Sequence, residues 1–243
     1  HLLCVATVYA FARTRLGRVG AALAAGFVLV LGVAWQDLLW PFQIGYFLSV
    51  AGGVTALRLT GIDSAAAQRG TAAGLGLALA SSGLGIPFAA AVTVHAALAR
   101  QWSRWWTVAL PGAAYAVWYL AYGESEATAA NLARAPRFAV AAAAAASGSL
   151  VGRPTGVVAW TAFAVIAAVG LVAVAVSRRL PPRLAATVIG AGVFWGLTGL
   201  TRAGIELPNA SRYLYPGAVF VVLALVDAAA LLAVRWSTVR TVA

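Results

Sequence analysis

Long runs of apolar residues make up most of the chain, and short breaks between them hold the charged and turn-forming residues. Val19–Trp35, Gly156–Val176 and Tyr213–Val234 approach or exceed the ~20 apolar residues that a helix needs to cross a bilayer. We therefore expect an all-α, polytopic transmembrane bundle of about nine membrane helices, forming a single transmembrane domain over residues 1–243. The expected helices are 1–12, 19–36, 42–58, 71–82, 85–100, 106–122, 156–176, 184–201 and 213–235.

The composition agrees with a membrane protein, since 63% of the residues are hydrophobic, 9% are charged and the mean hydropathy is +0.90. The formal net charge of +11 comes from arginines that lie between the apolar runs rather than in one basic domain. This distribution is typical of loops that follow the positive-inside rule, and we reject nucleic acid as a partner. The lipid bilayer is the partner that the composition indicates.

Two segments decide the topology. Thr71–Arg100 is interpreted as a hairpin of two short helices, because "SSGLGIP" at Ser81–Pro87 is a natural break. Phe138–Val151, rich in small residues, either crosses the membrane or is a re-entrant or interfacial helix at the outer face. The second choice leaves twelve of the 17 arginines inside, whereas a crossing leaves ten, so the positive-inside rule favours it. The arginines then outside are Arg134, Arg137, Arg153, Arg202 and Arg212.

This topology also sorts the six acidic residues. Asp63 falls inside and Asp227 lies within the last helix, while the outer face receives Asp37, Glu124, Glu126 and Glu206. Asp37 belongs to "WQDLLWPFQIGY", where tryptophans frame it at an external turn between two spans, so its charge is tolerated at the boundary. Loops that only connect helices need no such mixture of acids and arginines, and we therefore look for chemistry at the outer face.

Signatures of soluble enzymes are absent from the sequence, which has no Walker loop, no G-x-S-x-G and no H-E-x-x-H. Cys4 is the single cysteine, and His1 and His95 are the only histidines, so a zinc or non-haem iron site is hard to assemble. A divalent cation held by outer-face carboxylates stays open. His95 is either a polar tip packed between helices or a proton-relay residue. Asp227 is either a functional group inside the membrane or half of a structural pair.

"RAGIELPNASRYLYP" at 202–216 carries four of the candidate binding residues ahead of the last span: Arg202, Glu206, Arg212 and Tyr213. A guanidinium just above the hydrocarbon boundary suits a phosphate or pyrophosphate head group, because its planar fork gives two parallel hydrogen bonds and keeps its charge. A plain interfacial anchor of Arg and Tyr fits the same residues equally well.

"YGESEATAANLARAPRF" at 122–138 adds Glu124, Glu126 and Arg137 to the same face. These residues fit either the candidate site or a solvated loop. Gln43, in the segment of Asp37, completes the set of candidate substrate-binding residues.

The order of these features resembles the multi-pass GT-C glycosyltransferases that use polyprenyl-phosphate sugars, in particular the group related to protein O-mannosyltransferases and lipid A aminoarabinose transferases. "HLLCVATVYAFARTRLG" is similar to the second helix and basic turn of that family, "WQDLLWPFQIGYFLS" to a segment where an Asp opens the next helix, and "RYLYP" to an R-Y-x-x-P pattern before a late helix. The similarity covers most of the chain. Family members often have a lysine near the "SSGLGIP" break, where this chain has Ser81 and Ser82.

The resemblance implies an external cavity, a polyprenyl-phosphate-linked sugar donor, and an Asp or Glu general base in the first external loop. Because the chain starts inside an apolar run and contains no Met, we expect that loop and the first helix of the family to lie upstream of His1. Arg212 would bind the donor phosphate with Tyr213 and Arg202 nearby, and Asp37 would orient the acceptor or a bound cation. The expected location is a bacterial cytoplasmic membrane, with the site facing outward.

Two other functions stay open. A transporter or lipid flippase is favoured by the broken helices at 71–100 and by Asp227, but its polar groups should lie near mid-membrane and in paired halves. Here they gather at one face. The third possibility is a catalytically inactive membrane scaffold.

Overall fold

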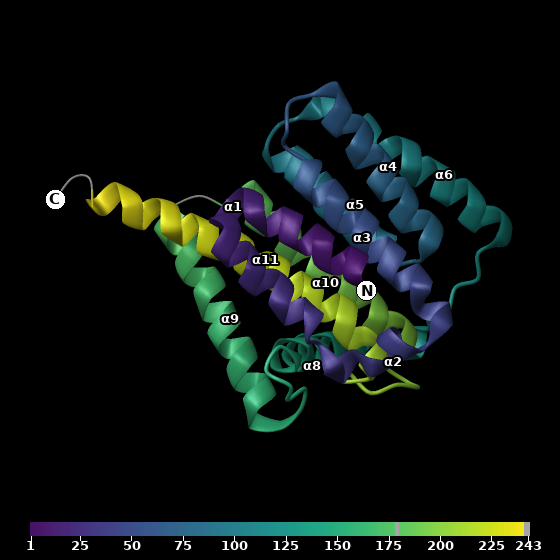
Figure 1. Ribbon diagram of the computed structural model, residues 1–243. Coiled ribbons are helices and arrows are strands. Elements are labelled where there is room, and N and C mark those ends of the chain that lie inside the picture. The colour runs from purple at the N-terminus through teal and green to yellow at the C-terminus, as the bar shows by residue number, and fades with distance from the viewer. Residues whose placement is uncertain (178–179, 241–243) are drawn as a thin grey trace.

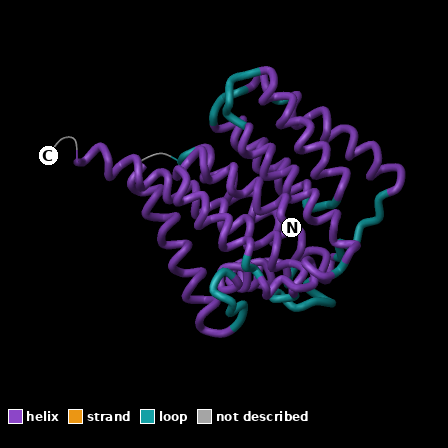
Figure 2. The backbone as a smooth tube through the Cα atoms, in the orientation of Figure 1, coloured by secondary structure: helices purple, strands orange, loops and turns teal. Residues whose placement is uncertain are grey.

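The computed structural model describes residues 1–177 and 180–240, and the side chains of all of these up to residue 234. Arg178 and Arg179, assigned above to the inside, lie outside the described residues, as do the side chains of Arg235 and Arg240. Within the described part of the chain every regular element is helical and none is a strand (Figures 1 and 2). The elements are α1 (Leu2–Leu29), η1 (Gly32–Ala34), α2 (Trp35–Leu39), η2 (Pro41–Gln43), α3 (Ile44–Leu59), α4 (Ala65–Ser81), α5 (Gly85–Leu98), η3 (Trp102–Arg104), α6 (Trp106–Tyr122), α7 (Ala129–Leu132), α8 (Ala135–Ser149), α9 (Gly156–Ser177), α10 (Pro182–Arg202) and α11 (Ser211–Arg240).

α1 consists of two segments that fold back on each other at Gly17. Gly17 has φ 72° and ψ −166°, a backbone conformation that glycine adopts readily and other residues do not. A straight helix of this length would span ~42 Å, yet Nε2 of His1 donates a hydrogen bond to the carbonyl oxygen of Leu29 at 3.3 Å. The break predicted between residues 12 and 19 is therefore present. It is shorter than predicted, because both helical segments extend further toward Gly17.

The bundle has two ends, which we call the α2 end and the opposite end. The α2 end holds η1, α2, η2, α7 and the connection between α10 and α11 (Figure 1). The opposite end holds the Gly17 turn, the connection between α3 and α4, and η3. At that end, Nη2 of Arg104 in η3 donates to Oδ1 of Asp63 in the α3–α4 connection at 2.8 Å.

α3 and α4 pack closely because glycines face each other across the contact. A Cβ built on Gly52 would lie 2.6 Å from the carbonyl oxygen of Gly74, and one built on Gly74 would lie 2.7 Å from that of Gly52. α4 begins before the predicted start at residue 71, because the Ser64 side chain caps it by accepting a hydrogen bond from the backbone N–H of Ala67. α4 ends at Ser81 and α5 follows at Gly85, so the predicted hairpin break is present.

The centre of the core is a stack of three phenylalanines from three helices. Phe88 of α5 lies against Phe220 of α11 with ring centroids 4.6 Å apart, and Phe220 lies against Phe194 of α10 at 5.9 Å. All three side chains are buried. The stack therefore fixes α11 between the other two helices.

α8 lies across the α2 end and does not pass to the opposite end. The carbonyl oxygen of Ala135, where α8 begins, lies 2.9 Å from an ideal Cβ on Gly199, near the end of α10. Ala146, near the other end of α8, lies 3.0 Å from an ideal Cβ on Gly217, in the second turn of α11. Both contacts are at the α2 end of the bundle, as the re-entrant or interfacial interpretation of Phe138–Val151 requires.

In the described part of the chain, three helices are long and apolar enough to cross a membrane: Gly156–Ser177, Pro182–Arg202 and Ser211–Val234. A fourth is obtained if α1 and the short helices after it, bent by 41° at the break, count as one span. Because α1 is folded back at Gly17, we treat Gly32–Leu39 as part of the connection to α3. α3, α4, α5 and α6 have 14 to 17 residues, which is shorter than the ~20 that a bilayer core requires. The expectation of about nine spans is therefore not confirmed.

α9 stands apart from the other helices along most of its length (Figure 1). Only 11% of its membrane-span window is buried. Between α9 and the pair α10 and α11 there is a groove of about 480 Å³, lined almost entirely by apolar side chains such as Phe163, Leu171, Val188 and Phe220. All three helices around the groove are candidate membrane spans by length and composition.

Candidate functional site

Asp37 is buried at the α2 end, and no described residue forms a hydrogen bond to its carboxyl group. Its side chain sits in the first turn of α2, and the residue is 1% exposed. Both carboxyl oxygens are buried and have no hydrogen-bond partner among the described residues. Burial raises the pKa of this carboxyl to about 8, and the nearby Arg212 charge opposes that rise only in part. A buried polar group without a partner is costly, so this carboxyl is a candidate binding group.

Asp37 stands where it does because the chain before and after α2 is fastened to α11. The Ser211 hydroxyl donates to the carbonyl oxygen of Val33 at 3.0 Å and accepts from the backbone N–H of Gln36 at 3.2 Å. Oε1 of Gln36 in turn accepts from the backbone N–H of Arg212 at 3.2 Å. These bonds hold α2 against the first turn of α11.

Arg212, which the sequence predicts to bind a phosphate group, lies partly exposed at the α2 end. Its guanidinium forms an ion pair with Glu206, and both side chains remain a little more than a quarter exposed. The guanidinium carbon also lies 5.2 Å from the centre of the Tyr213 ring, while Tyr213 itself is 7% exposed. The charge of Arg212 is thus held in place by one carboxylate and one ring, with part of the guanidinium open to a ligand.

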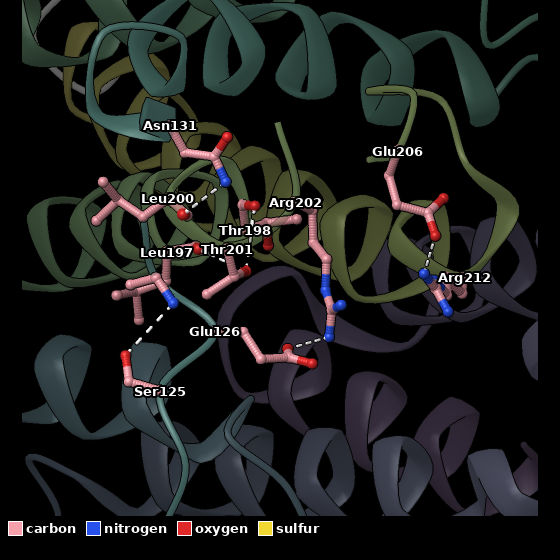
Figure 3. A network of polar contacts seen from close by, with 11 residues as sticks. Ser125, Glu126, Asn131, Leu197, Thr198, Leu200, Thr201, Arg202, Glu206 and Arg212 are labelled. Atoms are coloured by element: carbon pink, nitrogen blue, oxygen red, sulfur yellow. Dashed lines mark hydrogen bonds and ion pairs between the residues drawn. The ribbon is translucent and has the colours of Figure 1, made fainter. Parts of the chain in front are cut away.

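A second ion pair stands beside the first. Arg202, in the last turn of α10, pairs with Glu126 in the connection between α6 and α7 (Figure 3). The connection is anchored where Nδ2 of Asn131 donates to the carbonyl oxygen of Leu200 at 3.1 Å. Thr128 caps α7 by accepting from the backbone N–H of Asn131, so this stretch is ordered by its own hydrogen bonds.

An open pocket of about 570 Å³ lies next to Arg212. Arg212, Glu206 and Gln36 contribute its polar wall, and Trp35 and Trp40 contribute an aromatic wall with ring centroids 6.0 Å apart. We call it the Arg212 pocket. A pocket with an arginine on one side and two tryptophans on the other can accept an amphipathic ligand with an anionic group.

The structure brings most of the predicted site residues to one place. Asp37, Arg202, Glu206, Arg212 and Tyr213 gather at the α2 end with Glu126, and Gln43 is 3% exposed in η2 beside α2. Glu124 and Arg137 are at the same end but are exposed to solvent. Glu124 therefore fits the solvated-loop alternative, and Arg137 is an exposed residue of α8.

Gln36, Ser211 and Tyr46 were missed as site residues. Tyr46 lies within electrostatic range of Asp37 and Arg212. Gln36 precedes Asp37 and Ser211 precedes Arg212, so their places beside candidate residues were the available signal. The hydrogen bonds that join Gln36 to Ser211 link residues far apart in sequence, and no local pattern predicts them.

Among the described residues no group of three or more His, Cys, Asp and Glu side chains is arranged to hold a metal ion. The hypothesis of a bound cation therefore rests on Asp37 with oxygen ligands from a substrate or from water.

The sequence left two interpretations open for each of Asp227 and His95, and the structure shows what surrounds each side chain. Nε of Arg15 donates to Oδ1 of Asp227 at 2.6 Å, so Asp227 forms the structural pair that was one of its two interpretations. His95 is 7% exposed and its ring lies against Gly61, as a polar tip packed between helices would.

Comparison of this chain with protein-family models, with curated proteins and with solved structures gives no match. The functional argument therefore depends on the geometry of the α2 end and on the sequence resemblance.

Proposed function

We propose that this chain is a membrane glycosyltransferase-like protein of GT-C-like architecture that transfers a sugar from a polyprenyl-phosphate donor. The α2 end would face outward from a bacterial cytoplasmic membrane, and about nine helices would lie in the bilayer. The observation that carries the proposal is the partly exposed Arg212 guanidinium in the wall of an open pocket, with the Asp37 carboxyl buried within electrostatic range of it and without a hydrogen-bond partner among the described residues.

Arg212 supports the donor half of the proposal. Its guanidinium offers bidentate hydrogen bonds to a phosphate at the membrane boundary, with Arg202 supplying further positive charge. Glu206 and Glu126 hold these two arginines in position through ion pairs. The apolar groove between α9, α10 and α11 offers a membrane-facing surface for the isoprenoid chain of the donor.

Asp37 supports the acceptor half. Its two carboxyl oxygens have no partner among the described residues, so they are free to hydrogen-bond a hydroxyl group of an acceptor or to bind a cation. Trp35 and Trp40 can stack against a sugar ring at the mouth of the Arg212 pocket.

The proposed step is an inverting transfer. A bond forms between the acceptor hydroxyl oxygen and the anomeric carbon of the sugar, while the bond from that carbon to the phosphate oxygen breaks. The electron pair of the broken bond stays on the phosphate, where Arg212 stabilises the charge. The hydroxyl proton passes to a carboxylate base, which the family resemblance assigns to the first external loop.

The test uses the full-length protein and a mixed pool of polyprenyl-phosphate-linked sugars extracted from membranes. Protein with the proposed activity converts part of this pool to free polyprenyl phosphate, and Arg212→Ala and Asp37→Ala each reduce the conversion at least tenfold. Normal conversion by both variants would show that the assigned roles are wrong. Binding of the donor without conversion by the unaltered protein would instead identify the inactive scaffold.

The alternative of a transporter or flippase rests on the broken helices at 71–100 and on Asp227. Oδ1 of Asp227 is engaged by Arg15 at 2.6 Å, with both side chains at most 5% exposed, as in a structural ion pair. Solute uptake that is abolished by Asp227→Asn while folding is retained would favour transport over transfer.

A further inference from the structure

A second polar cluster lies at the opposite end of the bundle, away from the Arg212 pocket. Its centre is the ion pair of Arg15, in the turn of α1, with Asp227 of α11, and the two side chains are 5% and 3% exposed. Arg15 also donates through Nη1 to the carbonyl oxygen of Phe11 at 2.9 Å, and its guanidinium carbon lies 3.5 Å from the centre of the Phe11 ring. The pair is therefore held rigidly between two helices.

Two more arginines face this pair. Arg58, in the last turn of α3, lies within electrostatic range of Arg15, and its Nε is buried without a hydrogen-bond partner among the described residues. Arg183, in the first turn of α10, lies within electrostatic range of both Arg15 and Asp227 and is exposed. The Asp227 carboxylate thus faces Arg15 and Arg183, while Arg58 adds a further positive charge within electrostatic range of Arg15.

The other titratable groups that face the cluster do not balance its charge. His95 of α5 is buried beside it and its Nδ1 has no partner among the described residues, but a histidine cannot supply negative charge. Arg104, which also faces His95, is paired with Asp63. The cluster therefore carries an excess of positive charge that is partly out of water.

Excess positive charge costs free energy where it is removed from water, as at Arg15 and in part at Arg58, unless an anion compensates it. A phosphate group matches the geometry, because its several oxygens can accept hydrogen bonds from more than one arginine fork at once. Basic pockets between membrane helices at one face of the bilayer bind lipid head groups in this way.

We propose that Arg58, Arg183 and the Arg15–Asp227 pair form a binding site for a phosphate group at the opposite end of the bundle. The group belongs either to an anionic phospholipid of the adjacent leaflet or to free phosphate. This site is independent of the α2 end, and it neither requires nor supports sugar transfer.

The experiment measures the thermal unfolding temperature of the purified chain in a neutral detergent, with three additives compared at equal ionic strength. These are inorganic phosphate, micelles containing phosphatidylglycerol, and micelles containing phosphatidylcholine. We expect phosphatidylglycerol, phosphate or both to raise the unfolding temperature above the phosphatidylcholine value. Stabilisation by phosphate equal to that by phosphatidylglycerol identifies the free anion, and stabilisation by phosphatidylglycerol alone identifies the lipid head group.

Arg183→Gln is the informative variant because Arg183 is exposed and its loss leaves the core intact. We expect it to weaken binding of the stabilising additive at least tenfold, and Arg58→Gln to do the same. Arg69→Gln is the matched control, since Arg69 is exposed near the start of α4 at the same end and its loss changes the net charge equally. Absence of stabilisation by both anionic additives would overturn the proposal. So would an Arg69→Gln variant that loses as much affinity as Arg183→Gln.

Discussion

Nε of Arg15 donates a 2.6 Å hydrogen bond to Oδ1 of Asp227, and this ion pair joins the turn of α1 to the middle of α11 inside the protein. Neither side chain is more than 5% exposed. Because the pair is shielded from water, removal of one partner leaves the other charge buried without compensation. The pair therefore contributes mainly to the position of α11, which also carries Arg212.

Asp227→Ala should destabilise the folded chain by about 3–5 kcal/mol, because it leaves the Arg15 guanidinium buried and unpaired. The double variant Arg15→Met with Asp227→Leu removes both charges at similar volume and should cost much less. Thermal unfolding in detergent compares them. A double variant that is as unstable as the single one would contradict the assignment of the penalty to an unpaired charge.

Gly17→Ala should destabilise the chain by about 1–2 kcal/mol, since φ of 72° strains any residue with a Cβ. No atom lies within 4 Å of a Cβ built on Gly17, so the cost is one of backbone conformation rather than of packing. Gly26→Ala is the matched control, because its Cβ also meets nothing within 4 Å and its φ lies in the ordinary range. The control should be neutral or stabilising by up to ~1 kcal/mol. Equal losses in the two variants would show that Gly17 is not needed for the turn.

Stability should depend on pH through Asp37. Its carboxyl pKa is raised from 3.8 in the unfolded reference to about 8 in the folded chain. Between these values the folded state keeps a proton that the unfolded state has lost, so the free energy of unfolding falls as the pH rises, and it levels off above about 8. Asp37→Asn removes this contribution.

The Asp37→Asn variant should therefore be more stable than the unaltered chain at pH 9, by at least the ~1.4 kcal/mol that one pKa unit represents. The gap should close towards pH 4, and unfolding temperatures measured across this range give the comparison. A gap that stays constant over the whole range would mean that Asp37 ionises with an ordinary pKa.

Much of the helical organisation could be predicted from breaks in the apolar pattern. Gly17 after a basic stretch and the "SSGLGIP" segment mark real turns, because glycine, proline and serine interrupt the apolar runs there. The start of α4 was missed because Gln68 and Arg69 are polar residues inside a helix, and the cap by Ser64 lies before them. The short helix α2 is held by hydrogen bonds to α11 that no local pattern reveals, whereas α7 combines the local cap by Thr128 with a contact to α10.

The sequence predicted which residues lie together at one face of the protein, but it did not predict which of them contact each other. The arginine distribution placed Arg202 and Arg212 with Glu126 and Glu206 at one end, and the structure pairs them. Which carboxylate meets which arginine depends on the paths of the connecting segments, so sequence alone could not assign the pairs. That the Asp37 carboxyl has no hydrogen-bond partner among the residues described is likewise a property of three-dimensional packing.

The most direct test of the proposed role of the α2 end is the affinity of the purified chain for polyprenyl phosphate, measured beside polyprenol, which lacks the phosphate. We predict that polyprenyl phosphate binds at least tenfold more tightly, and that Arg212→Gln removes this preference, because a hydrogen bond to a charged group contributes about 1.5–3 kcal/mol. Arg153→Gln, an exposed arginine at the same end, should leave the preference unchanged. Equal affinity for the two lipids, or a preference that survives Arg212→Gln, would contradict the account.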